Sequence, residues 1–218
     1  MLHRIRLALE SGSFEKKLSG DVEADETFIG GKINMMNKKA KARKILREGA
    51  LAAGGTMGKA IVMGLLERHG EARVKVLPKR RRSNVVNEVT KHVEVGSNVY
   101  TDQLQSYSGL IADYAHQVIN HTESYVQGRI HTNGLENFWS LFKRSLKGTY
   151  VSVEPFHLQA YADEQCFRFN NRKVSDSERF IEALSQVAGK RLTWEALIGK
   201  NPRDCPVGWG LDSEGEYA

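Results

Sequence analysis

Three acidic residues spread along the chain have the types and positions expected of a metal-dependent phosphoryl-transfer site. Asp25 lies within a predicted strand, Asp102 falls where another predicted strand ends, and Glu136 begins a predicted helix. An α/β domain builds its sites at the ends of neighbouring strands, so carboxylates far apart in the sequence can meet there. Carboxylates hold Mg²⁺ and leave its other positions to water and phosphate oxygens. Two such ions about 3.5–4 Å apart can activate an attacking oxygen and stabilise a leaving one.

The predicted helix that carries Glu136 has one polar and one apolar side. Its polar positions recur at helical spacing and share one face: Glu136, Ser140, Lys143 and Lys147. Its apolar positions form a stripe that is expected to anchor the helix: Leu135, Phe138, Trp139, Phe142 and Leu146. The polar face would place a metal-binding acid near phosphate-binding lysines. The same spacing is also typical of the solvated face of an ordinary amphipathic helix.

Spacing alone does not single out the three acids. Asp25 has acidic neighbours at Asp21, Glu23 and Glu26, and we interpret those three as surface residues. Asp102 by itself could be the N-cap of a following helix. The site hypothesis therefore depends on the elements that bring the acids together.

Basic residues are concentrated in three runs. The net charge is +6 and the pI is about 9.3. Residues 32–59 contain eight Lys/Arg against a single acid, residues 79–82 are all basic, and Lys143, Arg144 and Lys147 form the third run. Any one run could be a solvated loop. Three runs in one chain favour contact with the phosphates of a nucleic acid.

Composition excludes several other classes of protein. The chain has 218 residues, of which 40% are hydrophobic and 27% charged, which is ordinary for a globular domain. It contains no apolar run of about 20 residues and no N-terminal signal segment, so we expect no membrane span and a cytoplasmic location. Cys166 and Cys205 do not form a zinc-binding pattern, and Cys166 is expected to be a small buried hydrophobe.

The elements predicted to position the acids form a mixed α/β domain with a central sheet. Alternation and turn residues predict five strands: 21–30, 59–67, 72–77, 98–101 and 115–121. Apolar periodicity and capping residues predict helices at 1–18, after Ser83 as N-cap, at 104–113, from 133 onward, at 156–171, after Ser175 as N-cap, and at 193–199. Residues 201–218 are expected to be weakly ordered.

Four motifs carry a resemblance to a known family: residues 23–32 (EADETFIGGK), 99–102 (VYTD), 131–144 (HTNGLENFWSLFKR) and 148–150 (GTY). They resemble the DDE transposases of bacterial insertion sequences, and most closely the IS1595 group with its ISXO2-like catalytic domain. Residues 167–172 (FRFNNR) are also similar. The resemblance covers about residues 20–173, and its third motif is long and specific.

The resemblance implies an RNase H-like fold, in which helices flank a mixed sheet, with a helical C-terminal extension. It implies that Asp25, Asp102 and Glu136 are the catalytic metal ligands for Mg²⁺, with Mn²⁺ as a substitute. It implies cleavage and joining of DNA strands, with transposon ends and target DNA as partners and, by analogy, a homodimer. The residues assigned to DNA contact are His131, Asn133, Lys143, Arg144 and Lys147. A histidine such as His131, taken alone, is more typical of a structural role.

Relatives usually carry an N-terminal zinc-ribbon and helix-turn-helix region that binds transposon ends. Residues 1–19 resemble the last helix of that region, 20–173 the catalytic domain, and 174–218 C-terminal helices with a weakly ordered tail. Two alternatives remain open at this point. The chain could be a truncated DNA-binding remnant without turnover, or a related nuclease that acts on RNA–DNA hybrids or DNA junctions. The motif at 131–140 argues against the nuclease.

Overall fold

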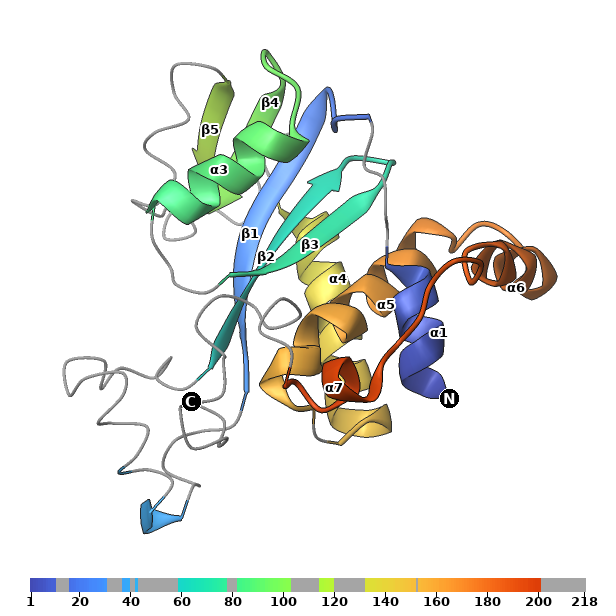
Figure 1. Ribbon diagram of the computed structural model, residues 1–218. Coiled ribbons are helices and arrows are strands. Elements are labelled where there is room, and N and C mark those ends of the chain that lie inside the picture. The colour runs from blue at the N-terminus through green and yellow to red at the C-terminus, as the bar shows by residue number, and fades with distance from the viewer. Residues whose placement is uncertain are drawn as a thin grey trace.

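The computed structural model describes residues 1–10, 16–30, 37–39, 42, 59–77, 82–102, 114–119, 132–151 and 153–200. Its centre is a five-stranded mixed sheet with the strand order β3-β2-β1-β4-β5 (Figure 1). The strands are β1 (Asp21–Ile29), β2 (Ala60–Glu67), β3 (Ala72–Leu77), β4 (Asn98–Asp102) and β5 (Ala115–Ile119). β1, β2 and β3 are antiparallel neighbours, whereas β4 runs parallel to β1 and β5 parallel to β4. All five predicted strands are confirmed.

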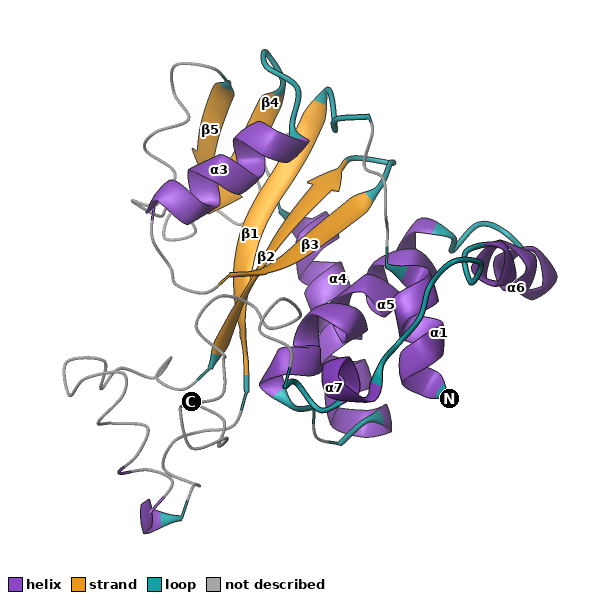
Figure 2. Cartoon of the chain, viewed as in Figure 1, coloured by secondary structure: helices purple, strands orange, loops and turns teal. Residues whose placement is uncertain are grey.

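Helices cover both faces of this sheet (Figure 2). α3 (Arg82–His92) packs on one face, where Val85 and Val89 join Val22 and Ala24 of β1 in one core cluster. α4 (Asn133–Arg144) and α5 (Leu158–Asn170) pack on the other face against β2 and β3. The predicted α/β class with a flanked mixed sheet is confirmed, and the arrangement is consistent with an RNase H-like fold.

The edge strand β3 is covered by side-chain amides of α5. Asn170 accepts from the backbone N–H of Ala72 at 2.7 Å and donates to its carbonyl at 3.0 Å. Gln159 accepts from the N–H of Val76 at 2.8 Å and donates to the carbonyl of Val74 at 3.0 Å. An exposed edge would present open pairing groups to other chains, so these amides both dock α5 and protect the sheet. Asn170 thereby gives one residue of the motif at 167–172 a structural role.

The N-terminal helix, predicted within residues 1–18, buries a charged residue. α1 (Leu2–Leu9) packs on α5, but Leu2 is 59% exposed, whereas Arg6 is buried. The reason is that Arg6 donates from Nε to Oε2 of Glu164 on α5 at 2.8 Å. An apolar pattern could not predict this charged contact.

Several predicted boundaries can be compared directly. α3 begins at Arg82, so Ser83 lies in its first turn and its predicted role as N-cap is wrong. Ser175 does cap α6 (Asp176–Ser185), through a capping box with Glu178. The helix predicted at 156–171 is confirmed as a 3₁₀ turn (Pro155–His157) leading into α5, and the last one as α7 (Trp194–Leu197).

Other expectations have mixed outcomes. Cys166 is buried as predicted, and burial raises the pKa of its thiol. The predicted helix at 104–113 and the tail at 201–218 lie outside the described residues. Among the helices that are described, none has the length and apolar character needed to cross a membrane.

Candidate functional site

The first two predicted acids occupy adjacent positions on neighbouring parallel strands. In the pairing of β1 with β4, Ala24 lies opposite Thr101. Asp25 and Asp102 are the next residues on their strands. Because paired strands lie about 4.8 Å apart, the backbone brings these two positions side by side. The side chain of Asp102 lies outside the described residues.

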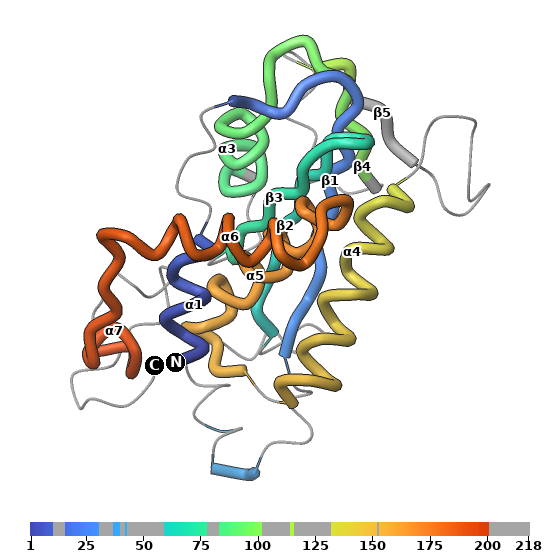
Figure 3. The backbone as a smooth tube through the Cα atoms, turned by 90° about the vertical axis from the view of Figure 1, so that its right-hand side faces the viewer, coloured from blue at the N-terminus to red at the C-terminus, as the bar shows by residue number. Residues whose placement is uncertain are grey.

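The helix that carries Glu136 is docked onto β1 beside Asp25. Figure 3 shows α4 alongside β1, and two hydrogen bonds join them. Trp139 Nε1 donates to Oδ2 of the half-buried Asp25 at 2.9 Å, and the backbone N–H of Leu135 donates to Oε2 of Glu23 at 3.0 Å. Glu136 lies between these two contact points along the helix and its side chain is exposed. The structure therefore brings the helix of the third acid onto the strand of the first.

Burial of the apolar stripe fixes the rotation of α4. Leu135, Phe138, Trp139 and Phe142 are buried, as predicted, and Leu146, just past the end of α4, is partly buried. The Phe138 ring packs edge-on against Trp139 and Phe169, with centroids 5.2 and 5.3 Å away. The predicted polar face is consequently exposed at each of its positions: Glu136, Ser140, Lys143 and Lys147.

A glycine on β2 makes room for the indole that holds Asp25. Gly64 lies opposite Asp25 in the β1–β2 pairing. A Cβ atom at this position would lie 2.7 Å from Cζ2 of Trp139 and 2.9 Å from Cδ2 of Leu135. Such distances are too short for carbon atoms, so the Trp139–Asp25 hydrogen bond requires glycine here.

We predict that Gly64→Ala displaces Trp139 from Asp25. Overpacking of this kind costs about 1–3 kcal/mol of the free energy of unfolding. In a background with Trp194→Phe and Trp209→Phe, the fluorescence maximum of Trp139 should shift. Gly148→Ala is the matched control, because a Cβ there meets no atom within 4 Å. An unshifted spectrum in Gly64→Ala would show that Trp139 does not need a glycine at position 64.

Four of the five residues predicted to contact DNA lie along one helical segment. Lys143 and Arg144 end α4, and Lys147 lies in the π-helix (Ser145–Thr149) that continues it; all three are exposed. Asn133 is the exposed first residue of α4 and lies about 20 Å from Lys147 by the helical rise. His131 lies outside the described residues, as do most positions of the basic runs at 32–59 and 79–82.

The interpretation of the neighbouring acids as surface residues is wrong for two of the three. Glu23 is 1% exposed and Glu26 is 9% exposed, while Asp21 is partly buried. Strand alternation directs Glu23 toward α4 together with Asp25, where Arg68 and the helix N-terminus surround it. The alternation of acids at 21, 23 and 25 was the sequence signal for this arrangement.

The residues at this edge fit a hard divalent cation by the chemistry of their donors. Carboxylate oxygens are the ligands that Mg²⁺ and Mn²⁺ prefer. The hydrogen bond from Trp139 to Asp25 is the kind of outer contact that orients a ligating carboxylate. Within the part of the chain that the structure describes, which leaves out the Asp102 side chain, no three metal-binding side chains gather into one group.

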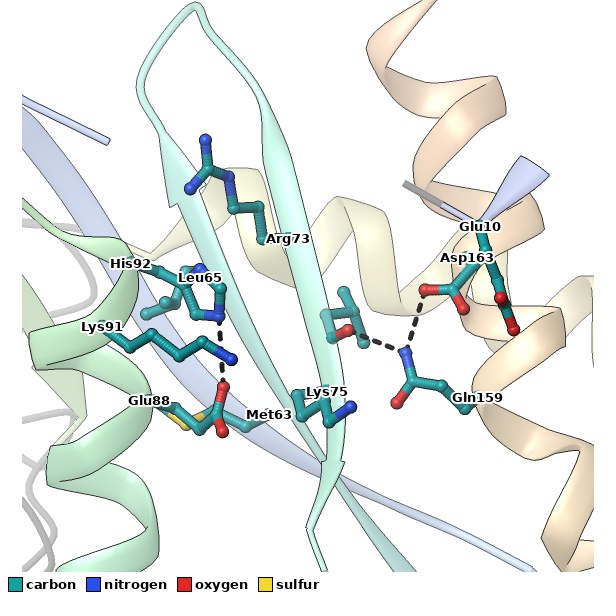
Figure 4. Close-up of a pocket in the computed structure, with 11 residues that line it drawn as sticks. Glu10, Met63, Leu65, Arg73, Lys75, Glu88, Lys91, His92, Gln159 and Asp163 are labelled. Carbon is teal, nitrogen blue, oxygen red and sulfur yellow. Dashed lines mark hydrogen bonds and ion pairs between the residues drawn. The ribbon is translucent and has the colours of Figure 1, made fainter. Parts of the chain in front are cut away.

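A separate cavity lies between α3 and α5, against β3 (Figure 4). It has a volume of about 480 Å³ and is lined by both basic and acidic side chains. Asp163 lines it, and burial raises the pKa of this carboxyl to about 7; nearby Glu10 adds to the effect, while a hydrogen bond from Gln159 opposes it. The cavity includes none of the three predicted acids.

Asp163 makes a testable contribution to the pH dependence of stability. Its folded pKa lies above its unfolded value of 3.8, so its contribution is full below pH 3.8 and is lost as the pH rises through 7. We predict that Asp163→Asn, which cannot ionise, gains about 2–3 kcal/mol over the wild type between pH 5 and pH 8. Urea unfolding at both pH values measures this, with the exposed Asp176→Asn as control. An identical difference at pH 5 and pH 8 would refute it.

Comparison with known proteins identifies the family of the chain. A family model for the ISXO2-like transposase domain matches residues 17–170, a range that contains the five strands, α3, α4, α5 and all three predicted acids. A search of curated proteins finds no match to the chain.

Proposed function

This chain belongs to the ISXO2-like transposase family, and we propose on that basis that it performs metal-dependent cleavage and strand transfer of DNA. One observation supports the proposal above the others. The parallel pairing of β1 with β4 makes Asp25 and Asp102 register neighbours, and α4 carries Glu136 onto the same strand. Three acids carried by three neighbouring elements are the arrangement that this chemistry would use.

Asp25, Asp102 and Glu136 would hold Mg²⁺, or Mn²⁺ in its place. When bound, two such ions supply an activated attacking oxygen and a stabilised leaving oxygen. The chain's own side chains do the positioning. Trp139 keeps Oδ2 of Asp25 fixed by its hydrogen bond, and the buried stripe of α4 keeps Glu136 on the exposed side of the helix.

The reaction would proceed in two displacements at phosphorus. Water first attacks the phosphodiester at the transposon end, and the leaving oxygen becomes a free 3′-hydroxyl. That hydroxyl then attacks a target phosphodiester in line and displaces a second 3′-oxygen, so each step forms one P–O bond and breaks one. By analogy with transposases that join two ends, we propose that a homodimer carries this out.

The basic end of α4 would bind the DNA backbone. Lys143 follows Glu136 by seven residues, so it lies two turns along the same face. Arg144 and Lys147 extend this positive surface beyond it, and Asn133 lies at the other end of the helix. DNA bound along α4 would pass directly over Glu136.

We predict that Lys143→Ala weakens DNA binding and flattens its salt dependence. Each lysine–phosphate contact releases counterions, so the slope of log K against log salt should fall in magnitude by about 1. Fluorescence anisotropy of labelled duplex DNA at several salt concentrations measures both quantities. Lys173→Ala, an exposed lysine beyond the end of α5, is the control. Equal slopes for wild type and Lys143→Ala would show that Lys143 does not contact a DNA phosphate.

The proposed function is tested by nicking of supercoiled plasmid DNA with Mg²⁺, with Mn²⁺ and with a chelator. We expect nicking with either metal, no nicking with chelator, and loss of nicking in Asp102→Asn. Binding of DNA without nicking would instead identify a non-catalytic remnant. Faster cleavage of an RNA–DNA hybrid than of duplex DNA would identify a nuclease. A preformed 3′-hydroxyl oligonucleotide joined to plasmid would demonstrate strand transfer.

A further inference from the structure

A cluster of charged and polar side chains lies on the same strands as the proposed site, one step away from it. It comprises Asp21 and Glu23 of β1, Arg68 after β2, and Asn98 and Tyr100 of β4, and we call it the Glu23 cluster. Its members occupy the positions that precede Asp25 and Asp102 in the strand alternation: in the β1–β4 pairing, Asp21 lies opposite Asn98, and Glu23 opposite Tyr100. The chemistry proposed above leaves it without a role.

Glu23 takes the place of a helix cap for α4. The first N–H groups of a helix have no partner within it and need an acceptor from elsewhere. Thr132, the N-cap residue, makes no capping bond with its side chain. Glu23 Oε2 instead accepts from the N–H of Leu135 at 3.0 Å, in the first turn that also carries Glu136. A carboxylate at this end also interacts favourably with the helix dipole.

The approach of α4 to Glu23 is close enough to require glycine. A Cβ atom at Gly134 would lie 2.8 Å from Oε2 of Glu23 and 2.5 Å from Cδ2 of Leu66. The first turn of α4 is thus pressed directly against the carboxylate. Any shift of this turn would carry Glu136 with it.

Arg68 extends the cluster from β1 to β4. Its Nε lies 3.2 Å from Oε1 of Glu23, its Nη1 lies 3.8 Å from Oδ2 of Asp21, and its guanidinium stacks 4.1 Å from the centre of the Tyr100 ring. Asp21 Oδ1 accepts from Asn98 Nδ2 at 2.8 Å and from the Tyr100 hydroxyl at 3.2 Å. The Glu23 cluster therefore joins the three elements that carry Asp25, Asp102 and Glu136.

We propose that Glu23 is a positioning residue of the metal site: it holds the first turn of α4 on β1 and so keeps Glu136 next to the strand that carries Asp25. This inference rests on the proposed function. Positioning can be tested separately from folding, because a buried ion pair can often be replaced by apolar side chains of similar volume without loss of stability. Such a replacement, however, supplies no acceptor for the helix N–H, so it separates positioning from folding.

The test uses the double variant Glu23→Leu/Arg68→Met in the full chain. Two quantities are measured besides stability: amide hydrogen exchange at Gly134, Leu135 and Glu136, and affinity for Mn²⁺ alone, from the electron paramagnetic resonance of free Mn²⁺. We expect exchange about tenfold faster, as for a lost cap, and Mn²⁺ affinity about tenfold weaker, as for lost outer contacts. The melting temperature should stay near that of the wild type. Asp163→Asn is the buried-acid control and should change neither quantity.

Glu23→Gln keeps the inference falsifiable if the double variant fails to fold. Its amide oxygen can still accept from Leu135, but without the strength that charge adds. The exchange rate and the Mn²⁺ affinity should therefore lie between those of the wild type and those expected for the double variant. Unchanged exchange and affinity in either folded variant would overturn the inference, as would changes that only follow the melting temperature. If the wild type binds no Mn²⁺, the proposed function fails, whereas the exchange measurement still decides whether Glu23 holds α4.

Discussion

Replacing Asp25 by Asn is expected to lower the rate of strand cleavage by about 10³-fold while the protein stays folded. The amide oxygen of Asn can still accept from Trp139 Nε1, so the local packing is preserved. The change removes the negative charge with which this position would hold a divalent ion. Metal ions contribute several kcal/mol of charge stabilisation in such reactions, and about 4 kcal/mol corresponds to 10³ in rate.

The measurement is plasmid nicking under single-turnover conditions, with circular dichroism as the check on folding. The matched control is Asp176→Asn, because Asp176 is an exposed acid at the start of α6. It should nick at the wild-type rate. Cleavage by Asp25→Asn within tenfold of wild type would contradict a role for Asp25 as a metal ligand, and an equal loss in Asp176→Asn would show an indirect effect.

Replacing Arg6 by Ala is expected to lower the free energy of unfolding by about 3 kcal/mol, because it removes the hydrogen bond to Oε2 of the buried Glu164 and the stacking of a guanidinium on two tyrosine rings. Glu164 keeps an ion pair through Oε1 with the exposed Arg168, at 2.9 Å. Arg6 is 3% exposed and its Nε lies 2.8 Å from Oε2 of Glu164. Its guanidinium also stacks on the rings of Tyr161 and Tyr150, 3.8 and 4.8 Å from their centres. The Tyr150 hydroxyl donates to Oε1 of Glu164 at 2.7 Å and completes the group.

Urea unfolding monitored by circular dichroism measures this cost. Arg179→Ala is the control, since Arg179 pairs with the exposed Asp176 within one helix, and such surface pairs contribute about 1 kcal/mol or less. A loss below about 1 kcal/mol in Arg6→Ala would show that α1 adds little to the fold. The expected loss would make α1, which precedes the matched segment 17–170, an integral part of the helical layer.

The parts of the fold that local patterns determine could be predicted from the sequence. Alternation predicted β1, β2 and β3, and the apolar stripe of α4 predicted which of its side chains are buried. Capping chemistry located the start of α6 at Ser175. These features depend on residues within a few positions of one another, so the sequence carries them directly.

Long-range charged contacts could not be predicted in this way. Arg6 and Glu164 are 158 positions apart, and Glu23 finds its partners at Arg68 and Leu135, which are 45 and 112 positions away. Their burial follows from tertiary packing, which no local pattern encodes. For the same reason the sequence does not show that the apolar side of α6 stays exposed, at Phe180, Ile181 and Leu184, as does Val187 just after the helix.

The candidate site was predictable in part. The positions of Asp25, Asp102 and Glu136 at a strand, a strand end and a helix start followed from the sequence. The residues that position Asp25 and the helix of Glu136 could not be predicted, because Gly64, Gly134 and Trp139 act through close packing between elements. Glycines of this kind are visible in a sequence, but the atoms they accommodate are visible only in the fold.

The most direct test of the proposed metal site is a crystal structure of the protein grown with Mn²⁺, in which anomalous scattering locates the metal. If the three acids form the proposed site, anomalous peaks will lie within about 2.6 Å of carboxylate oxygens from positions 25, 102 and 136. Peaks bound elsewhere, or an ordered Asp102 side chain directed away from Asp25 with no metal between them, would contradict it.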